Sequence, residues 1–208
     1  MSVVVLATRN PQKVPEVQAI LAEAVPGLEV VSLEGDEDWP GVRETEPTFI
    51  GNALLKARSV AAHTGRPAVA DDSGLTVREL NGMPGVLSAR WSGRFGAAGD
   101  RDRANVELVL DQLAHTPDER RGAEFVCAAA LVLPNGEERV AEGVLSGSLS
   151  REPRGAGGFG YDPIFIPDQE KRSTAEMSAE EKNAISHRGR AFRQLATELN
   201  GLELDQPD

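Results

Sequence analysis

Two long segments that favour β-structure, residues 123–133 and 139–149, flank the dipeptide Asn135-Gly136. Asn-Gly is preferred in two-residue hairpin turns, because both of its residues tolerate the positive φ angles that such turns require. The two segments are therefore predicted to be neighbouring antiparallel strands. Any fold of this chain has to contain a sheet that includes this hairpin.

The N-terminal part predicts a different kind of unit. Val3–Leu6 is a continuous apolar run, as found in strands that are buried on both faces. Asn10 suits a helix N-cap and Pro11 the first helical position, and apolar residues then recur at helical spacing up to Ala24. A strand, a polar loop and a helix, combined with an antiparallel hairpin, predict an α/β fold with a mixed sheet.

The rest of the chain predicts further elements but no domain boundary. Segment 28–33 favours a strand, and helical spacing of apolar residues recurs in segments 48–63, 106–113 and 186–199. Neither an internal repeat nor a linker separates autonomous domains. We therefore expect one domain over residues 1–208.

Charge and apolar content exclude several classes of protein. A net charge of −11 argues against a sequence-independent nucleic-acid binder, which needs a surplus of Lys and Arg. It does not exclude a small phosphate ligand, because charges more than about 8 Å away are screened at physiological salt. The longest apolar run, residues 125–133, is too short to span a membrane. The single cysteine, Cys127, lies in this run and is expected to be buried, which favours a cytoplasmic location.

Two adjacent acids, Asp71 and Asp72, stand between an apolar run and a glycine. Residues 68–70 are expected to end a buried strand, and Ser73-Gly74 to turn the chain into residues 75–80. Both acids would then lie at the carboxyl end of a strand, where open α/β sheets bind ligands. Because neighbouring side chains of a strand point to opposite faces, one acid would do the chemistry and the other would orient it. An ordinary Asp-Ser-Gly turn is the alternative.

The loop before the first helix is a candidate anion site. Thr8, Asn10, Lys13 and free backbone N–H groups would meet at a helix N-terminus. The loop lacks the glycines of a Walker or dinucleotide-binding motif, so those two interpretations fail. An ordinary connection between a strand and a helix remains open.

Two acids, Glu44 and Glu46, precede the predicted helix 48–63. If that helix packs beside the strand ending at Asp71, one of them approaches Asp72 and shares a cation with it. Otherwise both are exposed loop acids.

Residues 154–163 contain four glycines and two aromatic residues, Phe159 and Tyr161. Glycines let the backbone approach a flat ligand closely, and either aromatic ring can stack on such a ligand. The alternative is a glycine loop whose aromatic residues fill the core.

Three basic residues near the C-terminus are further candidates. Ser178 and Glu181 form a capping-box pattern for a short helix that contains Lys182. His187 and Arg188 open the last helix, although the helix dipole disfavours cations at that end. This placement indicates a ligand role, and the alternative is an ordinary surface histidine and arginine.

Together, the acids, the lysines and the aromatic loop fit a metal-bound nucleoside polyphosphate better than other ligands. A catalytically silent nucleotide sensor would use the same pocket. A glycosidase with two carboxylates is a more distant alternative, because it leaves Lys13, Lys182 and Arg188 unexplained.

Five motifs in one order resemble the inosine/xanthosine triphosphate pyrophosphatases over nearly the whole chain. They are Thr-x-Asn-x-x-Lys at 8–13, Phe-x-x-Asn-Ala-x-x-Lys-Ala at 49–57, Ala-Asp-Asp-Ser-Gly-Leu at 70–75, Gly-Phe-Gly-Tyr-Asp-Pro at 158–163 and Glu-Lys-Asn-Ala-x-Ser-His-Arg at 181–188. The resemblance implies hydrolysis of ITP, dITP and XTP to the nucleoside monophosphate and pyrophosphate.

The resemblance also implies roles for individual residues. The triphosphate is assigned to Thr8, Arg9, Asn10, Pro11, Gln12, Lys13 and Lys56. Further substrate contacts are assigned to Ser73, Phe159, Gly160, Tyr161, Asp162, Lys182, His187 and Arg188. Glu44 and Asp72 are the implied Mg²⁺ ligands, and Asp72 is the implied proton acceptor for the attacking water.

The implied fold is a long, mixed, twisted β-sheet flanked by helices, with two lobes and a central cleft, usually assembled as a homodimer. Two residues depart from the family pattern: Arg9 replaces a small residue, and Gly51 stands where an acid is expected. If that acid helps to hold the metal, Glu46 or a water has to substitute for it.

Overall fold

The computed structural model describes residues 2–8, 10, 13–33, 39, 41–95 and 101–199. Its strands are β1 (Ser2–Leu6), β2 (Leu28–Ser32), β3 (Ala68–Val77), β4 (Gly122–Val132), β5 (Glu138–Leu149) and β6 (Phe165–Pro167). Its α-helices are α1 (Lys13–Ala24), α2 (Phe49–Thr64), α3 (Arg101–Gln112), α4 (Ala179–Ile185) and α5 (His187–Leu199). No helix in these described ranges is long and apolar enough to cross a membrane.

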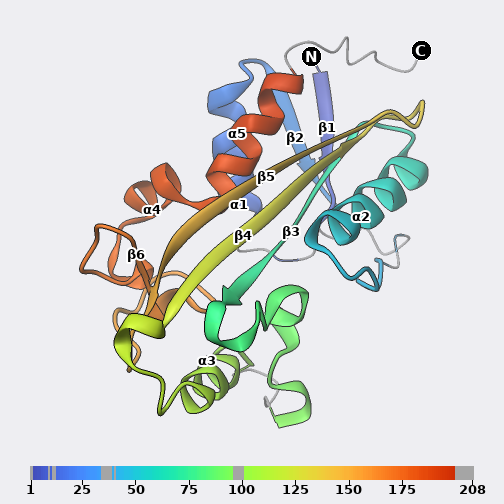
Figure 1. Ribbon diagram of the computed structural model, residues 1–208. Coiled ribbons are helices and arrows are strands. Elements are labelled where there is room, and N and C mark those ends of the chain that lie inside the picture. The colour runs from blue at the N-terminus through green and yellow to red at the C-terminus, as the bar shows by residue number, and fades with distance from the viewer. Residues whose placement is uncertain are drawn as a thin grey trace. The chain divides into compact units, whose positions relative to one another are not determined.

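The described strands form a six-stranded sheet in the order β2-β1-β3-β4-β5-β6 (Figure 1). β1 runs parallel to β2 and parallel to β3, and β5 runs antiparallel to β6. β4 and β5 are neighbours joined by the tight turn at residues 133–137, which requires them to run antiparallel. The predicted α/β fold with a mixed sheet is confirmed.

The chain folds into two compact units. The first comprises residues 1–72, 127–143 and 187–208, and the second comprises residues 73–126 and 144–186. Strands β3, β4 and β5 each contribute one portion to the first unit and another to the second. A single domain over residues 1–208 stays a prediction.

In the first unit, β1 is covered on both faces. Leu6 packs with Leu21 of α1 and Phe192 of α5. The helices α1 and α5 lie side by side in Figure 1. Val5 packs instead with Ala57 of α2, because alternate residues of a strand point to opposite faces. This two-sided burial explains the uninterrupted apolar sequence of β1.

The second unit has its own hydrophobic core. Val106 and Val109 of α3 are buried with Leu75 of β3 in this core. The rings of Phe125 and Phe165 lie 4.2 Å apart between centroids in the same cluster. The predicted apolar stripe of the third helix is therefore confirmed as a core face.

The structure corrects the predicted turn at Ser73-Gly74. β3 continues through both residues, so Asp71 and Asp72 lie within a strand and not at its carboxyl end. Gly74 allows neighbouring atoms to approach the strand closely, and it does not reverse the chain. A Cβ on Gly74 would lie 2.3 Å from Oγ of Ser88 and 2.6 Å from a backbone oxygen, so a side chain does not fit there.

A different strand, β1, ends beside the two acids. Its pairing with β3 joins Val5 to Ala68 and Leu6 to Val69, and β1 ends at Leu6. Asp71 and Asp72 follow on β3 just beyond this point. They therefore lie where the carboxyl end of a parallel strand commonly meets a ligand.

Candidate active site

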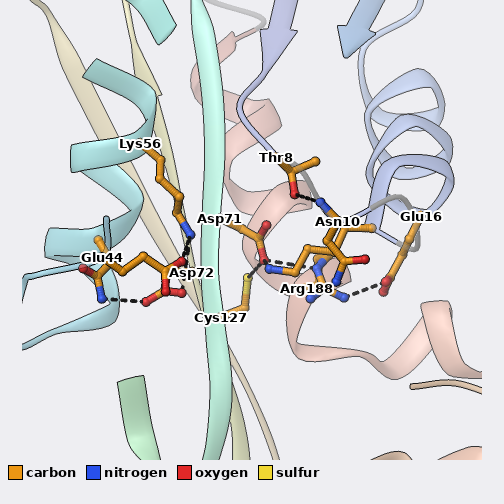
Figure 2. Close-up of polar contacts among 11 residues, drawn as sticks. Thr8, Asn10, Glu16, Glu44, Lys56, Asp71, Asp72, Cys127 and Arg188 are labelled. Atoms are coloured by element: carbon orange, nitrogen blue, oxygen red, sulfur yellow. Dashed lines mark hydrogen bonds and ion pairs between the residues drawn. The ribbon is translucent and has the colours of Figure 1, made fainter. Parts of the chain in front are cut away.

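Strand β3 presents Asp71 and Asp72 to opposite sides of the sheet, as the sequence predicts. Figure 2 shows Asp72 on the side of Glu44 and Lys56, and Asp71 on the side of Thr8, Glu16 and Arg188. Both aspartates are almost completely buried, with 2% and 6% of the surface of Asp71 and Asp72 exposed. Two separate polar clusters result, both within the first unit.

The first cluster surrounds Asp72. Nδ2 of Asn52 donates a hydrogen bond to Oδ2 of Asp72 at 3.0 Å. The Lys56 ammonium lies 2.8 Å from Oε1 of Glu44 and 3.5 Å from Oδ1 of Asp72. Asn52 and Lys56 are one turn apart on α2, which begins at Phe49, one residue after the predicted start.

Burial raises the pKa of Asp72, and the neighbouring charge of Glu44 adds to this, against the opposing effects of Lys56 and the hydrogen bond from Asn52. Burial by itself lowers the pKa of Lys56, but Asp72, Asp71 and Glu44 outweigh it and raise that pKa. A carboxylate with a raised pKa accepts a proton more readily than an ordinary aspartate, as a general base must.

The donors around Asp72 fit a hard divalent cation. Glu44 and Asp72 both face the Lys56 ammonium, so the two carboxylates already converge on one cation. Mg²⁺ prefers oxygen donors and is commonly held by one or two carboxylates together with substrate phosphates. Within the described ranges, no group of three or more His, Cys, Asp or Glu side chains forms a complete metal cage.

Glu44 and Glu46 have different surroundings in the structure. The charge of Glu44 acts on Asp72, whereas that of Glu46 acts on exposed Arg58. Glu46 is itself exposed, and its backbone N–H donates to Oδ1 of Asn52 at 3.0 Å. A Cβ on Gly51 would lie 2.7 Å from Cβ of Glu46, so the expected acid does not fit at this position.

The second cluster surrounds Asp71. Its Oδ2 accepts from Nζ of Lys13 at 2.8 Å and from Nε of Arg188 at 3.3 Å. Nη1 of Arg188 also donates to Oε2 of Glu16 at 2.6 Å. These acids offset the unfavourable helix dipole at Arg188, the second residue of α5.

Burial by itself raises the pKa of Asp71, but the charges of Lys13 and Arg188 hold that pKa well below its usual range. Burial likewise raises the pKa of the Cys127 thiol, and the charge of Asp71 raises it further. Cys127 is fully buried, as expected, and is not an activated nucleophile.

The predicted phosphate loop is described in part. The backbone N–H of Asn10 donates to Oγ1 of Thr8 at 3.2 Å, and that of Lys13 donates to the carbonyl of Asn10 at 3.1 Å. α1 begins at Lys13. The remaining predicted residues, Arg9, Pro11 and Gln12, lie outside the described residues.

A third cluster, in the second unit, centres on Asp162. This buried carboxylate accepts from Nζ of Lys182 at 2.5 Å, from the backbone N–H of Phe159 at 2.8 Å and from Oγ1 of Thr174 at 2.8 Å. The Lys182 ammonium also lies 4.9 Å from the centroid of the Phe159 ring. Asp162 thus orients the loop and its lysine.

Tyr161 belongs to the core of the second unit. It is buried, and its hydroxyl donates to the carbonyl of Ser88 at 2.9 Å. The next residue toward the N-terminus, Gly160, donates its backbone N–H to Oδ2 of Asp102 at 2.8 Å. Phe159, which is partly exposed, is therefore the aromatic residue of this loop that is available to a ligand.

Two predicted residues stand apart from these clusters. Ser73 lies in β3 directly after Asp72 and is half-buried, and His187 is the buried first residue of α5. Sequence reasoning did not single out Asn52 or Glu16 as site residues. Their signals were spacing: Asn52 lies four residues before Lys56, and Glu16 follows three residues after Lys13.

The fold and these clusters define a class: an α/β protein with paired carboxylates suited to a divalent cation and with lysines suited to phosphate. The model of the Ham1 family matches residues 4–198. The chain belongs to the Ham1 family, which confirms the resemblance that its motifs indicate.

Known relatives match over almost their entire length. The chain is 59% identical over 197 residues to a dITP/XTP pyrophosphatase of Frankia alni, covering 94% of this chain and 96% of that protein. It is 56% identical over 202 residues to a dITP/XTP pyrophosphatase of Streptomyces coelicolor, covering 97% and 99%.

A solved structure supports the same fold. The HAM1 protein from Coxiella burnetii superimposes with a TM-score of 0.85 at 42% identity, over 97% of this chain and 100% of that chain.

Proposed function

We propose that this protein hydrolyses deaminated purine nucleoside triphosphates, ITP, dITP and XTP, to the nucleoside monophosphate and pyrophosphate. The observation that carries the proposal is the buried carboxylate of Asp72, with a raised pKa, between Asn52, Lys56 and Glu44. Relatives that share more than half of its residues are named dITP/XTP pyrophosphatases. Removing such nucleotides cleanses the nucleotide pool.

In the proposed reaction, Asp72 accepts a proton from the attacking water, whose oxygen forms a bond to the α-phosphorus. The bond from that phosphorus to the oxygen bridging to the β-phosphate breaks, and pyrophosphate leaves with the electron pair. Asn52 holds Oδ2 of Asp72 and Lys56 lies 3.5 Å from Oδ1, so both residues orient the carboxylate that accepts the proton. The protein contributes mainly by positioning groups and stabilising charge.

The proposed cation is Mg²⁺, held by oxygen atoms of Glu44 and Asp72. When bound, Mg²⁺ neutralises phosphate charge and polarises the phosphoryl oxygens. Lys56, which lies against both carboxylates, would turn toward the phosphates.

We propose that residues 8–13 bind the triphosphate and that Phe159 and Lys182 bind the base. Phe159 would stack on the purine, and the Lys182 ammonium would donate to its 6-oxo group. Tyr161 and Asp162 are buried, and we propose that they shape and hold the loop. Their contact with the base stays a prediction.

We further propose a cytoplasmic homodimer. The location rests on the single free thiol, since disulfides mark oxidising compartments. The assembly rests on the family resemblance, and light scattering should report about twice the chain mass of 22.2 kDa.

The decisive experiment measures pyrophosphate release from ITP, XTP, ATP and GTP, with and without Mg²⁺. We expect rapid, Mg²⁺-dependent release from ITP and XTP only. Asp72→Asn should remain folded and lose at least ~10²-fold in turnover, as loss of a general base does. Binding of ITP without release would indicate a nucleotide sensor, and an unimpaired Asp72→Asn enzyme would refute the base assignment.

A further inference from the structure

The buried carboxylate of Asp71 joins three elements that are distant in sequence. Its Oδ2 accepts from Lys13 at the start of α1 and from Arg188 at the start of α5, and it lies 3.9 Å from Sγ of Cys127 on β4. Arg188 is 117 residues away in the chain. In Figure 2, the side chains of Asp71, Arg188 and Glu16 lie in a row on one side of β3.

Acidic and basic side chains alternate in this cluster and form a chain of ion pairs. Glu16 binds Arg188, Arg188 binds Asp71, and Asp71 binds Lys13, at 2.6, 3.3 and 2.8 Å. The guanidinium group of Arg188 is therefore held between two carboxylates. A planar guanidinium bound at both ends has little freedom to reorient.

Burial makes this arrangement costly to disturb. The side chains of Arg188 and Asp71 are 2% and 1% exposed, and that of Lys13 is 14% exposed. A buried charge that loses its partner destabilises a protein strongly, because neither water nor another group replaces the partner. The position of each cation therefore depends on the other through the carboxylate that both share.

The helix contacts support this coupling. A Cβ on Gly143 of β5 would lie 2.1 Å from the carbonyl oxygen of His187 and 2.6 Å from the backbone nitrogen of Ala191. The start of α5 thus packs directly on the backbone of β5. Arg188 is carried by a rigid support and not by a loop.

We infer that Asp71 is a positioning residue that couples Lys13 to Arg188, so that Arg188 holds the Lys13 ammonium in place through the shared carboxylate. This inference rests on the proposed function, in which Lys13 binds phosphate. Asp71 itself touches neither the reacting atoms nor the water. Arg188 acts largely through Asp71, because its guanidinium is buried against two acids.

The test is a double-mutant cycle in kcat/KM for ITP with Lys13→Met and Arg188→Met, which remove each charge and keep an apolar stem. Independent cations would make the double variant's loss the product of the single losses. We expect the double loss to be smaller than that product by at least about tenfold, as for directly coupled residues. A product within about twofold would overturn the inference.

The same cycle in an Asp71→Asn background tests whether the coupling passes through the Asp71 carboxylate. With the shared carboxylate gone, the losses from Lys13→Met and Arg188→Met should become multiplicative. Coupling that persisted unchanged would overturn the role of Asp71. If Asp71→Asn does not fold, Asp71→Glu replaces it, and it should restore coupling only partly, because its longer side chain shifts the carboxylate.

Two further variants distinguish the coupling between Lys13 and Arg188 from a nonspecific loss of activity. Glu16→Gln weakens one contact of Arg188 and leaves the contact between Asp71 and Lys13 in place, so coupling should persist. Glu138→Gln removes an exposed carboxylate that pairs with Arg58, and kcat/KM should be unchanged. Absence of pyrophosphate release by the wild-type enzyme would refute the proposed function, whereas multiplicative losses in an active enzyme refute this inference alone.

Discussion

Nδ2 of Asn52 donates to Oδ2 of Asp72 across 3.0 Å, and both side chains are buried. Helix α2 thereby fixes the rotation of the carboxylate on β3. A hydrogen bond that holds a general base does not enter the reaction, but its loss lets the base leave the productive orientation.

Asn52→Ala should therefore lower kcat for ITP by about tenfold or more and change KM little. It should also lower the free energy of unfolding by about 1–3 kcal/mol, because Asp72 and the N–H of Glu46 lose a buried partner. Ser59→Ala, on the same helix, loses a hydrogen bond from Trp39 and is the matched control. Equal losses of kcat in both variants would contradict the assignment.

Glu44→Gln should raise the Mg²⁺ concentration that gives half-maximal activity by at least about tenfold, since even loss of an outer-shell partner costs a metal site that much. Glu46→Gln should leave this concentration unchanged, because Glu46 is exposed, whereas Glu44 shares the Lys56 ammonium with Asp72. A Mg²⁺ titration of pyrophosphate release measures both variants. A larger increase for Glu46→Gln than for Glu44→Gln would assign the metal-ligand role to Glu46.

Lys182→Met should lower kcat/KM for ITP by about 10- to 100-fold, the value of a hydrogen bond to a charged donor. The slow reaction with ATP should hardly change, because adenine presents an amino donor at position 6 and a lysine has nothing to accept it. The ratio of ITP to ATP activity therefore narrows. Lys171→Met, at an exposed lysine of the same unit, should leave the ratio intact.

Asp71→Asn should lower the free energy of unfolding at pH 7 by about 3 kcal/mol, as expected for breaking a buried ion pair. Because Lys13 and Arg188 lower the pKa of Asp71 in the folded state, its contribution is complete above the unfolded pKa of about 4 and is lost as the pH falls further. Urea unfolding between pH 7 and pH 3 should show the two proteins converging. A constant difference would refute this explanation.

Local features of the chain were predictable from the sequence alone. The hairpin at Asn135-Gly136, the start of α2 after Thr48 and the capping box of Ser178 with Glu181 are all present. Each depends on residues within a few positions of one another, whose backbone preferences and hydrogen bonds act before any tertiary contact forms. The alternation that places Asp71 and Asp72 on opposite faces is equally local.

Tertiary structure alone decided the rest. Gly74 has the sequence pattern of a turn, but the close approach of Ser88, whose Oγ accepts from the N–H of Leu75 thirteen residues earlier, makes it part of a strand. A glycine permits both outcomes, so only its neighbours in space choose between them. Likewise, the pairing of Asp71 with Arg188 across 117 residues leaves no periodic signal in the sequence, because it exists only once the sheet and its helices bring the two charges together.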